Sequence, residues 1–300
     1  MIIDSSTLRG LRRSYSAVFN KAFTETTTNK DKIATTVPSS TSMNTYGWMG
    51  DFPQMREWIG ERVINHLKEK AYNIENQHFE MTVAVSRDDI EDDNLGLYSI
   101  QMQMMGQAAK EHPDIMVMGQ LKNGFKQKCY DDQPFFHTSH KVDKYVYKNK
   151  SDAKLCVESY TEARAAMGSL TNERGTSINI RPSLLVVPPV LEKEARLILE
   201  ADFINGTSNP WKGSAELLVE NNISGGEYPE NWFLLDVSKP LKPIIFQLRK
   251  PTKFVSMVNE NDSNVFTHNE YVYGADGRYA TGYGFWQMAF GSTGEKNIVG

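Results

Sequence analysis

Apolar residues recur at helical spacing close to the amino terminus of the chain. Between Asp4 and Phe23 they lie three or four residues apart, and Asp4 or one of the two serines after it can serve as the N-cap. From Thr24 to Asn44 the chain is rich in Thr, Ser and Asn, a composition that is typical of a disordered linker when it stands alone. The pattern therefore predicts an amphipathic helix followed by a polar arm.

A longer helical pattern begins after Ser86. Ser86 and Asp89 have the spacing of a capping box, and the acidic run that ends at Asp93 favours a helix start over a cation site. One apolar side then repeats every three or four residues on both sides of Pro113, where we expect the helix to break. This side is expected to be core and consists of Tyr98, Met102, Met105, Ala109, Ile115, Met118, Leu121 and Phe125.

Strand-like patterns complete an α+β fold. Residues 72–85 alternate between apolar and polar positions. Residues 151–242 are predicted to form a helix at 157–170, a strand at 183–187, a helix from Pro189, and strands at 215–219 and 232–235. Towards the carboxyl end, strands are predicted at 244–248, 254–258, 271–274 and 285–290, with a polar turn at 259–264 and a hairpin turn at Asp276-Gly277.

The most unusual stretch lies between the polar arm and the first strand. Within residues 46–71, Trp48, Phe52 and Trp58 stand among many charged residues. Taken alone, this segment together with residues 72–85 is typical of a hairpin that packs on its own domain, although the pattern does not decide the matter.

Composition indicates a globular protein with no general attraction to polyanions. The 300 residues are 40% hydrophobic and 11% aromatic, enough for a sizeable core in one large or two modest domains. A formal charge of -4 and a pI near 5.9 give no overall attraction to nucleic acid or anionic membrane. The longest apolar run, residues 184–190, is too short to span a membrane, and a secretory signal is missing. We therefore expect a cytosolic chain in which Cys129 and Cys156 are reduced.

Residues with catalytic or metal-binding chemistry form no complete motif. Possible metal ligands gather in one place, and they are Cys129, Asp131, Asp132, His137 and His140. Their spacing does not match a four-ligand zinc pattern, so we assign no metal and no cofactor. Lysines interleaved with tyrosines at 141–150 fit single-strand binding and a lysine-protected edge strand equally well. A carboxylate-based hydrolase that uses Asp236 or Glu270 needs no motif and is kept as a remote alternative.

Several short motifs follow one another in an order that resembles one protein family. They are Tyr46-Gly47-Trp48, the run from Phe52 to Gly60, Ser86 to Asp93, Trp232 to Asp236, Lys239 to Gln247, Glu270 to Asp276, and Gly284 to Ala289. From about Met1 to about Ser292 the chain resembles the major head subunit of Mu-like phages and prophages, known as the T protein. That family has the Hong-Kong-97 type of major capsid fold. The resemblance implies a shell-building protein and not an enzyme.

The resemblance also implies a role for each segment. It assigns residues 1–45 to an amino-terminal arm, 46–85 to an extended loop, 86–150 to the first part of a peripheral domain, 151–242 to an axial domain, and 243–300 to the return into the peripheral domain and the carboxyl terminus. The peripheral domain carries a long spine helix on a sheet. The extended loop of this fold reaches over an adjacent subunit, so Trp48, Phe52 and Trp58 are the expected intersubunit contacts.

The partner that the resemblance implies is the protein itself, as hexamers and pentamers of an icosahedral shell. The shell encloses double-stranded DNA, which the subunits contact without sequence specificity. Because the family-like helix follows Met1 at once, we expect the scaffold and the protease to be separate proteins, and a portal and decoration proteins complete the head. The protein is thus expected in the virion, assembled in the host cytoplasm without a membrane. An encapsulin compartment, which shares the fold, is the nearer alternative.

Overall fold

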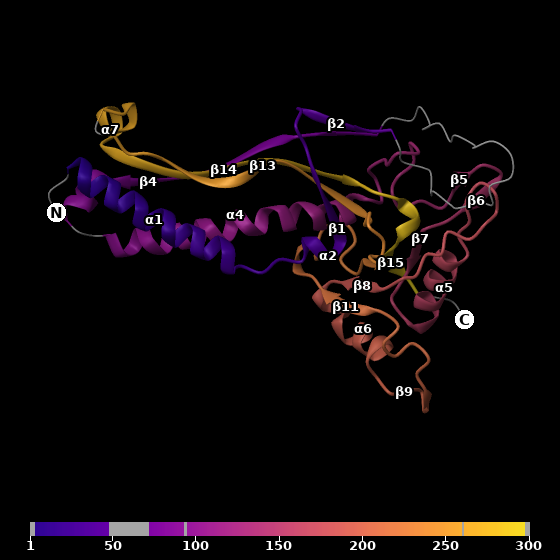
Figure 1. Ribbon diagram of the computed structural model, residues 1–300. Coiled ribbons are helices and arrows are strands. Elements are labelled where there is room, and N and C mark those ends of the chain that lie inside the picture. The colour runs from indigo at the N-terminus through magenta and orange to yellow at the C-terminus, as the bar shows by residue number, and fades with distance from the viewer. Residues whose placement is uncertain (1–3, 48–71, 93–94, 260, 298–300) are drawn as a thin grey trace.

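The protein folds into a long arm and a compact lobe that meet at an angle (Figure 1). The structure, a computed structural model, describes residues 4–47, 72–92, 95–259 and 261–297. In the arm, two long helices lie along one face of a twisted sheet, and the lobe is built around a second sheet. One hydrophobic cluster, here called the arm cluster, lies between the helices and the sheet of the arm. A larger one, the lobe cluster, fills the lobe and its junction with the arm.

The arm sheet has four strands in the order β1-β13-β14-β4. They are β1 (Ala34–Pro38), β13 (Ile244–Met257), β14 (Glu270–Tyr283) and β4 (Gln77–Ser86). β1 runs parallel to β13, and the other neighbours are antiparallel. The helices α1 (Ser5–Glu25) and α4 (Leu95–Asn123) cover one face of this sheet. The strands predicted at 244–248 and 254–258 are thus parts of one long strand.

The amino-terminal helix has the bounds and the buried side that its spacing predicted. Asp4 caps α1, because its Oδ1 accepts a hydrogen bond from the Thr7 amide at 2.7 Å. The buried residues of the helix are Leu8, Leu11, Tyr15, Phe19 and Ala22. This prediction is confirmed.

The helical pattern after Ser86 is divided into two helices. Ser86 caps the short α3 (Arg87–Glu91) by accepting a hydrogen bond from the amide of Asp88 at 3.2 Å. The carboxylate of Asp89 accepts a hydrogen bond from the hydroxyl of Tyr98 on α4. The acidic residue of the expected capping box therefore joins α3 to the long helix.

α4 continues through Pro113, so the predicted break at this residue is wrong. A proline removes one backbone hydrogen bond and crowds the preceding turn of a helix. The helix persists because packing fixes both of its halves: Met102 belongs to the arm cluster and Met118 to the lobe cluster. Ile115, which the spacing also predicted as core, is 49% exposed.

The lobe sheet has five strands in the order β11-β8-β12-β15-β7. They are β11 (Glu216–Val219), β8 (Leu184–Val187), β12 (Trp232–Leu235), β15 (Ala289–Lys296) and β7 (Lys150–Ala153). Every residue of β8 and β12 is buried, as expected for short apolar strands at the centre of a sheet. The helices of the lobe are α5 (Val157–Gly168) and α6 (Glu192–Leu199). Because β15 lies in this sheet, residues 243–300 contribute to both the arm and the lobe.

The polar segment 24–44 is not a linker. It forms α2 (Lys30–Ile33), β1 and β2 (Met43–Tyr46). The amide of Asn29 donates a hydrogen bond to Asp114 on α4 at 2.8 Å, and β1 pairs along its length with β13. Its composition suggested disorder because the residues that hold the segment are distant in the sequence.

Asp276 and Gly277 lie in the middle of β14, so the predicted hairpin turn at this pair is wrong. Asp276 pairs with Lys253 of β13 and with Glu80 of β4. A Cβ atom on Gly277 would lie 2.7 Å from the hydroxyl oxygen of Thr252, so the glycine permits a close approach within the sheet. β13 and β14 are instead joined through the predicted polar turn, where α7 (Ser263–His268) begins.

Short ribbons complete the described part of the chain. They are β2 with β3 (Tyr72–Glu75), β5 (His140–Val142) with β6 (Tyr145–Tyr147), and β9 (Phe203–Ile204) with β10 (Thr207–Ser208). Single 3-10 turns occur at Pro189–Leu191, Asn221–Ile223 and Trp286–Met288. The β2–β3 ribbon projects from the junction of arm and lobe, and β9 forms the end of the lobe (Figure 1).

The two arm helices touch where α4 carries a glycine. A Cβ atom on Gly106 would lie 2.4 Å from the carbonyl oxygen of Phe19 on α1. No side chain fits at that distance, so the absence of a side chain at Gly106 sets how closely α1 packs on α4.

Replacing Gly106 with alanine should lower the free energy of unfolding by about 1–3 kcal/mol, because the added methyl group forces the helices apart. The matched control is Gly119→Ala on the same helix, where a Cβ atom would meet no atom within 4 Å. The control should be neutral or stabilising by up to about 1 kcal/mol, because alanine favours a helix over glycine. Urea unfolding of the unassembled subunit, followed by circular dichroism, measures both. Equal midpoints for the two variants would contradict the close contact.

Candidate intersubunit surfaces

α4 exposes a second apolar side in addition to its buried one. Leu97, Ile100 and Met104 are 71%, 56% and 64% exposed, and Ala108 and Ile115 continue this side at helical spacing. We call these five residues the α4 stripe. No charged residue occurs between positions 95 and 109 of the sequence. A helix that is apolar on more than one side is normally buried, so the α4 stripe has the character of a contact surface.

An apolar hollow lies beside the α4 stripe. It has a volume of about 260 Å³, and its lining includes Ala108 and Ile115 of α4 and Phe79 and Met81 of β4, together with the charged residues Glu80 and Glu111. β4 is the last strand of the arm sheet, so one of its edges has no neighbouring strand among the described residues. Free strand edges pair readily with other chains. Stripe, hollow and strand edge together form one candidate contact surface on the arm.

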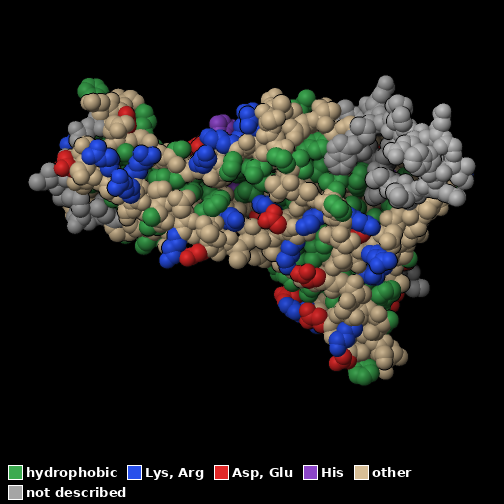
Figure 2. All heavy atoms as spheres, viewed as in Figure 1, with side chains coloured by type: hydrophobic (Ala, Val, Ile, Leu, Met, Phe, Trp, Pro, Cys, Tyr) green, Lys and Arg blue, Asp and Glu red, His purple; other side chains and the backbone are tan. Residues whose placement is uncertain are grey.

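Two further apolar residues project from the extremities of the molecule. Phe266 on α7 is 91% exposed at the end of the arm, and Phe203 on β9 is 67% exposed at the end of the lobe. Figure 2 shows hydrophobic side chains at both ends. Large aromatic residues at such positions are typical of protein contacts.

The contact candidates from the sequence, Trp48, Phe52 and Trp58, lie outside the described residues. The ends of the segment that contains them are described. Tyr46 of β2 pairs with Tyr72 of β3, so the two described ends of this segment lie side by side. They belong to the β2–β3 ribbon at the junction of arm and lobe.

Three of the possible metal ligands, Cys129, Asp131 and His140, form a hydrogen-bond network around the buried His140, whereas Asp132 is exposed. The Nδ1 atom of His140 lies 2.6 Å from Asp131 Oδ2, and its Nε2 atom lies 3.1 Å from Asn149 Oδ1. The imidazole ring stacks on Trp286 with 4.1 Å between the centroids. Cys129 donates to Asp131, and His137 accepts a hydrogen bond from the Ser139 amide.

This network has the features of a packing element. Asn149 donates through its Nδ2 to the backbone oxygens of Phe135, Trp286 and Ala289, so it joins three segments of the lobe. In the described part of the chain, no three His, Cys, Asp or Glu side chains lie where they could hold a metal ion.

The pKa of Asp131 is lowered from its ordinary value of 3.8. Burial acts in the opposite direction, but the hydrogen bond and the charge of His140 outweigh it, together with the hydrogen bonds from Cys129 and the Gln133 amide. Because the pKa is lower in the folded state, the carboxylate stabilises the fold at neutral pH. That contribution is lost as the pH falls below 3.8 and through the folded-state value.

The two carboxylates of the hydrolase alternative lie in different parts of the molecule. Asp236 follows β12 in the lobe, is fully buried, and accepts hydrogen bonds from the amides of Arg181 and Ser238 at 2.9 Å. Glu270 begins β14 next to α7 at the far end of the arm. The structure therefore does not bring them together as an acid and base pair.

The lysine-rich stretch 141–150 forms most of the β5–β6 hairpin and the first residue of β7. Lys144 lies over the ring of Tyr145 at 5.2 Å, and Lys150 lies over the ring of Phe125 at 5.8 Å. These two cations thus already contact aromatic rings of their own chain.

Comparison with known proteins assigns the family. The sequence profile described as the Mu-like prophage major head subunit gpT matches residues 8–154, 144–223 and 219–298. The chain belongs to this family. It is a major head subunit, a structural protein of the phage capsid, and the function predicted from the motifs is confirmed.

Curated relatives extend over most of the chain. The major capsid protein of Escherichia phage Mu is 34% identical over 298 residues, which are 99% of this chain and 77% of the relative. The Mu-like prophage FluMu major head subunit of Haemophilus influenzae is 33% identical over 264 residues, which are 88% of this chain and 66% of the relative.

Solved capsids have the same fold. The subunit of the bacteriophage JBD30 procapsid is 36% identical, with a TM-score of 0.63 over 99% of this chain and 78% of its own. A virus-like particle from Pyrococcus furiosus is 7% identical, with a TM-score of 0.54 over 93% of this chain and 98% of its own, and it shows the fold alone. The predicted α+β capsid fold of the Hong-Kong-97 type is therefore confirmed. Among the described residues, no helix is long and apolar enough to cross a bilayer.

The α4 stripe was not predicted from the sequence, although a signal for it was present. The helical spacing predicted one buried side, which did not include the exposed residues Leu97, Ile100 and Met104. The uncharged run from position 95 to 109 could have shown that this helix has two apolar sides.

Introducing a carboxylate into the α4 stripe should prevent shell formation without unfolding the subunit. Ile100→Glu and Met104→Glu each place a charge where a partner must cover apolar surface, and we expect the shell yield to fall at least about tenfold. Gln103→Glu is the control, because it adds the same charge at an exposed position of the helix outside the stripe. Circular dichroism checks the fold, and sedimentation of assembled particles measures the yield. Wild-type yields for both stripe variants would exclude the stripe as a contact.

Replacing Asp131 with alanine should destabilise the subunit by about 1–3 kcal/mol at neutral pH, because it leaves a buried nitrogen of His140 without its partner. The difference from the wild type should begin to shrink as the pH falls below 3.8, because the carboxyl group is protonated first in the unfolded chain and at lower pH in the folded one. Denaturant unfolding between pH 3 and 7 measures this dependence. A difference that stays constant over the range would argue against a contribution from the charge of Asp131.

Proposed function

We propose that copies of this chain assemble as pentamers and hexamers into a closed icosahedral shell around the double-stranded genome of a Mu-like phage or prophage. Family membership carries the proposal. The α4 stripe supports it, because exposed apolar residues on one side of a long helix are suited to burial between subunits. Permanent interfaces of this kind bury roughly 2,000 Å² or more.

The segment between β2 and β3 is proposed as the clasp between subunits. Trp48, Phe52 and Trp58 then lie on or next to a loop that crosses a neighbouring copy. The ribbon supports this arrangement, because Tyr46 and Tyr72 hold both ends of the segment at one place. In this scheme residues 1–45 are the amino-terminal arm, 46–85 the extended loop, 86–150 and 243–300 the peripheral domain, and 151–242 the axial domain.

Other head proteins complete the assembly. A capsid of bacteriophage JBD30 carries trimers of a minor capsid protein, which supports a decoration protein here. A separate scaffold and protease and a portal are further proposed partners, and the packaged DNA is contacted without sequence specificity. Assembly takes place in the host cytoplasm, and the subunit has no catalytic role. An encapsulin-type compartment has less support, because its likeness would rest on the fold without the motifs of the Mu-like family.

The wild-type chain should form closed shells that electron microscopy can detect, and the triple variant Trp48→Ser, Phe52→Ser, Trp58→Ser should not. We expect circular dichroism of the variant to match the wild type, because the described residues of the arm cluster and the lobe cluster remain unchanged in it. The reason for the loss is that a partner surface no longer receives the three aromatic side chains.

Two results would contradict this proposal. A wild-type chain that stays monomeric at high concentration, with and without a scaffold protein, would exclude the shell. Normal shells from the triple variant, or loss of its fold, would show that the segment is not a clasp between subunits.

A further inference from the structure

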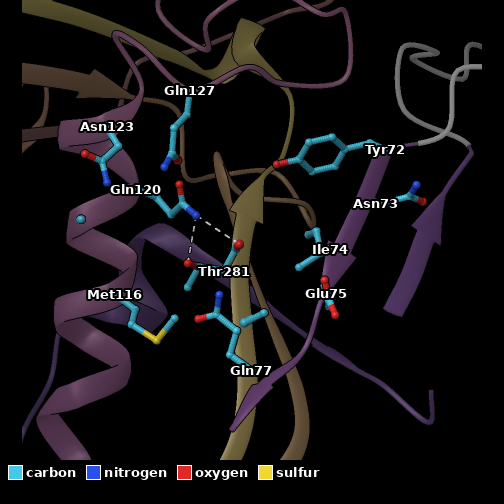
Figure 3. A pocket seen from close by; sticks show the side chains of 12 residues that line it. Tyr72, Asn73, Ile74, Glu75, Gln77, Met116, Gln120, Asn123, Gln127 and Thr281 are labelled. Atoms are coloured by element: carbon cyan, nitrogen blue, oxygen red, sulfur yellow. Dashed lines mark hydrogen bonds between the residues drawn. The ribbon is translucent and has the colours of Figure 1, made fainter. Parts of the chain in front are cut away.

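A polar cavity lies at the junction of arm and lobe, next to the part of α4 that follows the α4 stripe. Its volume is about 470 Å³, within the range of ligand-binding pockets. Figure 3 shows its walls: Gln120 and Asn123 on the α4 side, β3 with Glu75 on the opposite side, and Thr281 of β14 between them, while the side chain of Asn73 points from β3 towards β2. We call it the amide cavity.

Carboxamide side chains dominate the lining of the amide cavity. They are Asn73, Gln77, Gln120, Asn123 and Gln127. Among the described residues that line it, Glu75 alone is charged. A carboxamide presents both a hydrogen-bond donor and an acceptor, so the cavity offers both kinds of group without a net positive charge.

In several of these carboxamides, only one of the two polar groups, the oxygen or the NH₂, has a hydrogen bond within the described residues. Gln120 donates through Nε2 to the backbone oxygen and the hydroxyl of Thr281 at 3.1 and 3.0 Å. The Oε1 atom of Gln120 is buried and has no hydrogen-bond partner among the described residues. Gln127 accepts from the hydroxyl of Tyr283 through Oε1, and Asn73 accepts from Thr45 through Oδ1, so the NH₂ groups of both remain for other bonds. A buried acceptor without a partner costs about 1–3 kcal/mol, so a ligand that donates to Gln120 is favoured.

The lining selects one class of ligand. Phosphate or nucleic acid would require basic residues, and none is among the described residues of the lining. An apolar ligand would leave the amides unpaired. An extended polypeptide backbone offers neutral N–H and C=O groups in alternation, and these match carboxamide side chains in both roles.

The helix wall leaves room for such a segment at Gly119. A Cβ atom at this position would meet no atom within 4 Å, so the cavity extends up to the backbone of α4. Gly119 is also a place where a larger side chain can fill the cavity without a clash.

We propose that the amide cavity binds an extended segment of a second copy of this chain in the assembled shell. The inference rests on the proposed function. A second copy is the favoured occupant for two reasons. The amide-rich lining, which has no basic residue among the described residues, fits a polypeptide backbone, and β3, which forms one wall, belongs to the ribbon from which the proposed clasp between subunits departs. The cavity would thus continue that interface.

Chemical labelling tests whether the cavity becomes occupied. Asn123→Cys places an exposed thiol at the cavity. Lys126→Cys places an exposed thiol three residues further along the chain, at a position that does not line the cavity. The thiols are labelled with a small maleimide in unassembled subunits and in shells that contain this chain alone, with the wild type as the background for Cys129 and Cys156.

The two variants should respond differently to assembly. We expect labelling of the Asn123→Cys variant to be at least about tenfold slower in the shells, and labelling of the Lys126→Cys variant to be similar in both states. Equal labelling of the Asn123→Cys variant in both states, or protection only when another phage protein is present, would overturn the proposal.

Filling the cavity tests whether its occupation is needed. Gly119→Leu should keep the fold and reduce the shell yield at least about tenfold, whereas Gly119→Ala leaves most of the space free and should assemble as the wild type does. The maleimide label on the Asn123→Cys variant can also fill the cavity. It does not affect folding, because it is attached to the folded subunit before assembly. Labelled subunits of the Asn123→Cys variant should fail to form shells, and labelled subunits of the Lys126→Cys variant should form them. Wild-type shell yields from both the Gly119→Leu variant and the labelled Asn123→Cys variant would overturn the proposal.

These outcomes can be told apart from a failure of the proposed function. If the wild-type chain forms no shells, the proposed function is wrong. If wild-type shells form and the subunits with a filled cavity assemble equally well, the function stands and the amide cavity is not a contact between copies.

Discussion

α4 carries more apolar surface than one subunit covers, and this constraint links the fold to the shell. One side of the helix supplies Met102 to the arm cluster and Met118 to the lobe cluster, so the two parts of the molecule share one rigid element. Pro113 lies between these two anchoring regions, and packing on both sides keeps the helix intact there. The other side, with Ile100 and Met104, faces solvent. Folding buries the first side and leaves the second exposed, which is why we propose it as a surface that a neighbouring subunit covers.

Buried polar contacts fix the places where separate segments meet. The hydroxyl of Tyr46 donates to Gln247 Oε1 at 2.9 Å, and Gln247 Nε2 donates to the Ile74 oxygen and to Asn76 Oδ1 at 3.1 and 2.9 Å. These bonds tie the β2–β3 ribbon to β13 of the arm sheet. The His140 network does the same within the lobe. Buried polar groups that are fully hydrogen-bonded favour one arrangement of the chain over others. These bonds therefore fix the position of the β2–β3 ribbon relative to the arm sheet.

The surfaces available for contact differ in chemistry. The α4 stripe is apolar, whereas the amide cavity is polar and offers hydrogen bonds. Apolar area contributes most of the energy of association, but it selects partners poorly. Polar groups that must find partners reject ligands that cannot supply them, because an unpaired buried amide is costly. A shell built from one chain needs both properties, since its subunits must bind strongly and in one register.

The sequence by itself determined α1, the buried side of α4, most strands of the lobe and the family, because these depend on local spacing and on motifs in a fixed order. It could not show that residues 24–44 are ordered, since the partners of β1 and Asn29 lie on β13 and α4. It placed a turn at Asp276, where pairing on both sides keeps the strand continuous. The tertiary structure alone decided which apolar residues of α4 stay exposed. The position of α1 and of the sheets, and not the hydrophobicity of Leu97 or Ile115, sets which side is covered.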